Sequence, residues 1–110
     1  MRHKVAHCIL IGMAILRETP SGFAEESTMR RGETLLSANC ARCHAIGRTG
    51  ISPHPEAPPF RTLSRKYPIE GLAEALAEGL SVGHPDMPEF VFQPPEIRAI
   101  LDYLNAIQQK

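Results

Sequence analysis

The run Cys40-Ala41-Arg42-Cys43-His44 constrains this chain more than any other feature of its sequence. Two cysteines at this spacing, at the end of a helix, lie one turn apart, so their thiols face the same side. The pattern C-x-x-C followed directly by histidine is the attachment signature of a c-type haem. Each thiol can add to one vinyl group of the porphyrin, and the histidine is placed to bind the iron. The motif therefore predicts covalent attachment through Cys40 and Cys43, with His44 as an axial ligand.

Three other uses of a C-x-x-C pair compete with this interpretation. A thioredoxin-like redox pair needs a βαβ setting, and no strand-rich pattern surrounds the motif. A structural zinc site wants a second pair of ligands at suitable spacing, whereas His54 and His84 stand far apart in proline-rich stretches. A disulfide of a secreted protein is the third alternative, but closing so short a loop stabilises a protein little. The comparison favours haem attachment.

The N-terminal stretch has the pattern of a cleavable secretion signal. A positively charged start is followed by a mostly apolar run over 5–16 and by small residues that end at Ala24. We therefore expect a signal peptide over 1–24, cleaved after Ala24, and one domain over 25–110. An uncleaved N-terminal anchor is the alternative, although the apolar run is shorter than the ~20 residues that a transmembrane helix needs.

The charge balance and the length of the mature chain limit its partners. Without residues 1–24 the chain carries nine Lys and Arg against eleven Asp and Glu. No broad basic surface is therefore available for nucleic acid, and we expect neither nucleic-acid binding nor stable insertion in a membrane. A domain this short buries a limited core. A large apolar cofactor would add buried surface, so we expect the chain without it to be weakly folded.

Apolar periodicity predicts a helical chain. A polar tail over 25–28 should precede the first helix, in which Leu35 and Leu36 share one buried stripe. Glu70, Glu74 and Glu78 should form a solvated helix face. The expected helices cover about 29–41, 60–66, 69–80 and 94–108, with a proline-rich loop over 45–59.

A second informative stretch is Met87-Pro88-Glu89-Phe90, which precedes the last expected helix. Methionine in a loop flanked by prolines is an odd place for a core side chain. Together with the C-x-x-C-H run and the terminal helix, this stretch makes residues 30–108 resemble the class I cytochrome c family. The resemblance implies Met87 as the second axial ligand of the haem iron. His84 is the rival ligand and would give a lower potential, because a soft thioether favours ferrous iron.

The same resemblance implies an all-α fold of three to five helices around one covalently attached haem c. In the family, a proline carbonyl accepts a hydrogen bond from the axial histidine, and here Pro53, Pro55 and Pro58 are all available. The terminal helices of the family cross closely, with a small residue against an aromatic one. Gly32 and Tyr103 would fill those two roles.

The function implied by the resemblance is one-electron transfer in the periplasm by a monomeric carrier that is not itself an enzyme. Its partners would be redox proteins such as a dehydrogenase, an oxidase or a respiratory complex. One alternative is the electron-accepting cytochrome subunit of a periplasmic dehydrogenase or oxidase complex, with Val91, Phe92 and the prolines of 53–59 as an apolar contact surface. Another is a gas-binding or peroxidatic haem protein, which requires that Met87 leave the sixth iron position open.

Overall fold

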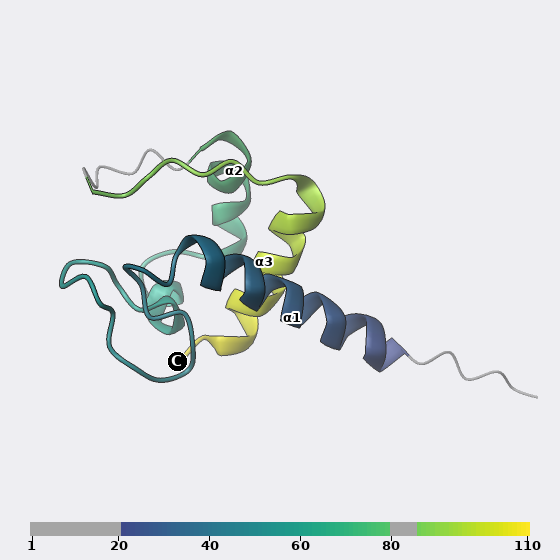
Figure 1. The fold of residues 1–110 in the computed structure, drawn as a ribbon. Helices are drawn as coiled ribbons and strands as arrows, with labels where there is room; N and C mark the ends of the chain where they lie inside the picture. The colour runs from purple at the N-terminus through teal and green to yellow at the C-terminus, as the bar shows by residue number, and fades with distance from the viewer. Residues whose placement is uncertain (1–20, 80–85) are drawn as a thin grey trace, which may run out of the picture.

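The computed structural model describes residues 21–79 and 86–110. Within these two stretches all regular structure is helical, as the sequence predicted, and Figure 1 shows the arrangement. The predicted signal segment up to residue 20 and the rival ligand His84 lie outside the described residues. In the part of the chain that is described, no helix is long and apolar enough to cross a bilayer.

The first helix, α1, spans Ser21–Asn39 and begins earlier than the sequence predicted. The expected polar tail over 25–28 is helical and mostly exposed. Arg30 and Glu26 form an exposed ion pair at 3.1 Å, at the i,i+4 spacing that brings side chains together on a helix surface. Local pairing of this kind supports helix without burial, and a prediction based on apolar periodicity misses it.

The C-terminal helix α3 spans Pro94–Ile107 and crosses α1 (Figure 1). The crossing is close because Gly32 has no side chain. A Cβ at this position would meet the carbonyl group of Ala99 and would lie 2.8 Å from the Cβ of Tyr103. The predicted contact between Gly32 and Tyr103 is therefore confirmed, and the Ala99 backbone is an additional partner.

Two 3₁₀ turns and one short α-helix connect the terminal helices. They are η1 over Phe60–Arg65, η2 over Ile69–Gly71 and α2 over Leu72–Glu78. The sequence predicted a single helix over 69–80, whereas its first turn is 3₁₀ and α2 ends before Gly79. The φ of 102° at Gly79 lies in the left-handed region that only glycine adopts without strain. The three glutamates expected on the solvated face are exposed.

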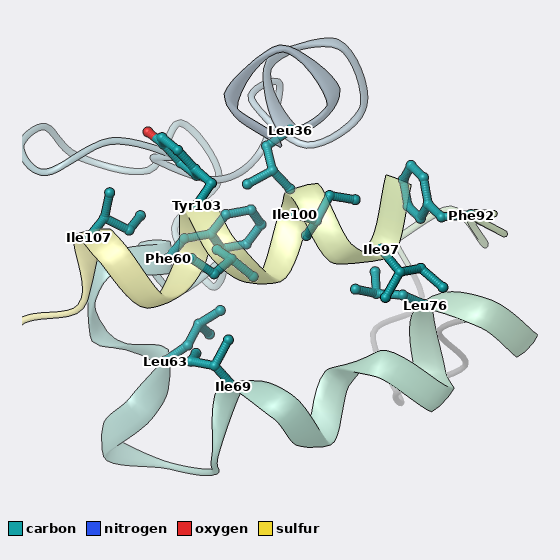
Figure 2. Packing of buried hydrophobic residues seen from close by; sticks show 11 residues of the cluster. Leu36, Phe60, Leu63, Ile69, Leu76, Phe92, Ile97, Ile100, Tyr103 and Ile107 are labelled. Carbon is teal, nitrogen blue, oxygen red and sulfur yellow. The ribbon is translucent and has the colours of Figure 1, made fainter. Parts of the chain in front are cut away.

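The hydrophobic core surrounds α3, whose predicted apolar stripe is buried (Figure 2). Ile100 is fully buried, and Leu36 reaches it from α1. Both leucines of the predicted stripe contact this core, but Leu36 is buried whereas Leu35 is only partly buried. The buried cluster consists of Leu36, Phe60, Leu63, Ile69, Leu76, Phe92, Ile97, Ile100, Tyr103, Leu104 and Ile107.

Phe92 belongs to this core, and its predicted place in an apolar contact surface is wrong. Its side chain is 8% exposed, and its backbone N–H donates to the carbonyl of Leu76 at 2.9 Å. Val91 is 60% exposed, so these two consecutive side chains face opposite sides. This contact packs the segment that follows Met87 against α2.

Candidate functional site

The C-x-x-C-H residues leave the end of α1 in a tight turn. The backbone N–H of Cys40 donates to the carbonyl of Leu36 at 2.8 Å. The N–H groups of Cys43 and His44 both donate to the carbonyl of Cys40, at 3.1 and 2.9 Å. The turn places both thiols and the imidazole on the wall of one pocket. Both thiols are free and partly buried.

The imidazole of His44 is held from two directions. Its Nδ1 lies 2.8 Å from the carbonyl oxygen of Pro58, and because a carbonyl only accepts, Nδ1 carries the proton and donates it. The ring of Phe60 packs against the imidazole with a centroid separation of 4.6 Å and a tilt of 32°. Among the three prolines that the sequence left open, the geometry therefore selects Pro58. This contact fixes the tautomer and leaves Nε2 free to bind a metal.

Met87 lies on the wall of the same pocket and is partly buried. Pro88 and Phe90 continue this wall, and Phe90 also packs against the core. The pocket has a volume of about 330 Å³, and its lining includes Ala57 and Pro58 from the proline-rich loop. The structure thus brings together the four residues that the sequence assigned to the site, which are Cys40, Cys43, His44 and Met87.

Burial sets the chemistry of the first thiol. Burial, with a smaller contribution from Cys43, raises the pKa of the Cys40 thiol to about 11. A dithiol redox centre works through a thiolate, and its pKa is characteristically lowered. Cys40 stays protonated at neutral pH, so the electrostatics of the site argue against a thioredoxin-like use of the pair.

The ligand geometry also gives the zinc alternative no support. Among the residues that the structure describes, no group of three or more His, Cys, Asp or Glu side chains is arranged to hold a metal ion. In the pocket, the two thiols are accompanied by the thioether of Met87 and by the imidazoles of His44 and His54.

The residues of the pocket fit a haem. Two thiols share one wall, His44 presents a free Nε2, and apolar side chains, among them Met87 and Phe90, line the pocket together with several polar ones. Next to Phe60 in the chain, the Nη1 atom of Arg61 is buried and has no hydrogen-bond partner among the described residues. Leaving a buried donor unpaired costs about 1–3 kcal/mol. Arg61 is not among the residues that line the pocket, so the fit rests on the two thiols, the imidazole and the apolar lining.

Five polar residues on the pocket wall were absent from the predicted site, and two of them, His54 and Asp86, contact each other. The Nε2 atom of His54 lies 3.4 Å from Oδ2 of Asp86, and both residues line the pocket. They are 32 positions apart, and no motif or periodicity joins them. Their one shared signal in the sequence is that each stands beside a proline, in a loop that the resemblance places near the haem.

Comparison with known families agrees with this geometry. Residues 27–104 match a family model described as cytochrome C oxidase, cbb3-type, subunit III. The match begins within α1, contains the C-x-x-C-H run and Met87, and ends within α3. No curated protein and no solved structure matches the chain.

Proposed function

We propose that this chain, which belongs to the family of cbb3-type cytochrome c oxidase subunit III, is a periplasmic one-electron carrier that uses His44 and Met87 as axial ligands. Membership in the family makes it a monohaem c-type cytochrome with covalently bound haem c, and an electron carrier. When bound, the haem supplies an iron that cycles between the ferrous and ferric states. Beyond family membership, we propose the two axial ligands, the periplasmic location and the monomeric state.

The ligand assignment rests on the observation that four predicted site residues line the same pocket. Cys40 and Cys43 line it beside His44, and Met87 reaches it from a segment more than forty positions later. Cys40 and Cys43 would hold the porphyrin through thioether bonds. Such fixed attachment suits a carrier, because the haem stays in place through repeated cycles.

His44 and Met87 would set the properties of the iron. The Pro58 carbonyl holds the Nδ1 proton of His44, which orients the ring and makes Nε2 a better donor. A methionine thioether is a soft ligand that favours ferrous iron and raises the potential. Pro88 and Phe90 add apolar surface to the pocket wall beside Met87.

The compartment follows from the N-terminal pattern. Residues 1–24 would direct export and be cleaved after Ala24, leaving a periplasmic domain over 25–110, with an uncleaved anchor as the alternative. We propose a monomer that exchanges electrons with redox protein partners. Transient redox complexes use small interfaces, and the edge of the pocket is the natural place for one.

A second candidate function is a permanent subunit of an oxidase complex. The family description names such a complex, and Val91 remains 60% exposed beside the pocket-lining Phe90. Ile51, in the loop after the C-x-x-C-H run, is 93% exposed. Co-purification of the native protein with an oxidase in mild detergent supports this candidate, and purification as a free monomer supports the carrier.

The weak far-red absorption band of ferric haem, which reports a methionine–iron bond, tests the axial assignment. We expect the band in the matured protein and its complete loss in Met87→Ala. Met29→Ala is the matched control, because Met29 is partly buried in α1 outside the pocket and its loss should leave the band intact. If the wild type lacks the band and its reduced form binds carbon monoxide readily, the sixth position is open and the gas-binding alternative replaces this proposal.

A further inference from the structure

We propose that His54 and Asp86 are positioning residues that hold the segment carrying Met87 over the pocket. The inference rests on the proposed axial role of Met87 and adds to it a reason why the methionine stays on the iron. Neither side chain is assigned to bind the haem.

His54 is anchored on the side of the pocket that carries the attachment motif. Its backbone N–H donates to the carbonyl of Cys43 at 3.1 Å. Its Nδ1 accepts a hydrogen bond from the backbone N–H of Glu56 at 3.2 Å. Because Nδ1 accepts, the proton of the neutral ring lies on Nε2. That Nε2–H is the group that faces Asp86, at 3.4 Å from its Oδ2.

Asp86 belongs to the other side of the pocket, since it directly precedes Met87. Among the described residues, its contact with His54 is the one hydrogen bond that joins the loop 45–59 to the segment 86–90. A carboxylate that is drawn toward His54 therefore keeps the adjacent methionine on the pocket wall. Without this contact, the described segment is held farther along, by the packing of Phe90 against the core and by the hydrogen bond from Phe92 to Leu76.

The expected size of the effect follows from exposure. The side chain of His54 is 31% exposed and that of Asp86 is 77% exposed, so solvent screens the pair and its contribution is modest. A modest contribution still matters for a methionine that exchanges between bound and released states. Any exogenous ligand that competes for the iron binds in proportion to the released population.

Imidazole binding to the ferric holoprotein measures that population. We expect His54→Ala and Asp86→Ala each to increase the affinity for imidazole by about two- to fivefold. The double variant should show no further increase, because either change alone removes the same contact. Asp86→Asn keeps an acceptor oxygen and should fall closer to the wild type. Asp102→Ala, which removes a similar exposed pair with Arg98 on α3, is the control and should leave the affinity unchanged.

The outcomes separate this inference from the axial assignment. A wild type that shows the methionine–iron band, together with single variants that bind imidazole as the wild type does, overturns the inference alone. Increases that multiply in the double variant overturn it as well, since they show that the two residues act independently. A wild type without the band overturns the role of Met87 and the inference with it. Thermal unfolding of each variant identifies any change in affinity that comes from general loss of structure.

Discussion

Tyr103 connects the hydrophobic core to the loop that follows the attachment motif. Its side chain belongs to the buried core (Figure 2), and its O–H donates to the carbonyl of Ile46 at 3.1 Å. Burial and the nearby Glu33 raise the pKa of Tyr103, while Arg48 acts in the opposite direction. The hydroxyl therefore remains a donor at a higher pH than a free tyrosine would.

We expect Tyr103→Phe to lower the free energy of unfolding by about 1 kcal/mol at neutral pH, through loss of this hydrogen bond. Because the pKa is raised in the folded state, the unfolded chain releases the phenolic proton first. The contribution of Tyr103 to the free energy of unfolding is then fully present below about pH 10 and falls as the pH rises further. The phenylalanine variant lacks this part of the decline. Urea unfolding of both holoproteins should show that their difference in free energy of unfolding is smaller above about pH 10 than at pH 7. A difference that stays constant contradicts the argument.

The residues of the site differ in how far the sequence could predict them. Cys40, Cys43 and His44 form a contiguous motif whose chemistry requires those residue types, and Met87 stands in a recognisable loop. The acceptor for His44 could not be chosen from the sequence, because several prolines share one loop and only the folded backbone decides which carbonyl turns inward. The His54–Asp86 contact joins two loops and leaves no local pattern.

At the level of elements, the terminal helices were easier to predict than their boundaries and connections. The apolar stripe of α3 is strong because tertiary burial imposes it along the whole helix. The first turns of α1 are exposed, so no stripe marks them. Gly79 stops α2 through a positive φ, a backbone property that a count of apolar residues does not contain.

The crossing of α1 and α3 gives a prediction about Gly32. An added methyl group would collide with the Ala99 carbonyl, which belongs to backbone and moves only if the helices separate. Gly32→Ala should therefore lower the free energy of unfolding by about 1–3 kcal/mol, even though alanine is the better helix former. Denaturant unfolding of the holoprotein, followed by far-ultraviolet circular dichroism, measures the change.

Gly71→Ala is the matched control for this crossing. A Cβ at Gly71 would meet nothing within 4 Å, and its φ of −64° suits any residue. We expect it to be neutral or to stabilise by about 0.4–1 kcal/mol. Equal destabilisation by both substitutions would show that loss of glycine itself, and not the close crossing, is responsible.

At the scale of the whole molecule, the core and the pocket share their walls. Phe60 belongs to the buried cluster and also packs against His44, while Phe90 lines the pocket and packs against that cluster. Phe90 therefore buries part of its surface against protein and presents the rest to the pocket. A domain of this size has little apolar surface to spare, so a haem in the pocket adds contacts that the core alone does not supply.

The last prediction concerns the chain without its haem. In Cys40→Ala/Cys43→Ala, the thioether bonds cannot form, and the haem loses its permanent place in the pocket. We expect low helicity and a broad, weakly cooperative unfolding transition by circular dichroism, because a group that binds only the folded chain shifts the folding equilibrium toward it. A double variant that unfolds cooperatively within about 1 kcal/mol of the holoprotein would show that the protein core is sufficient, and that the haem serves electron transfer without stabilising the fold.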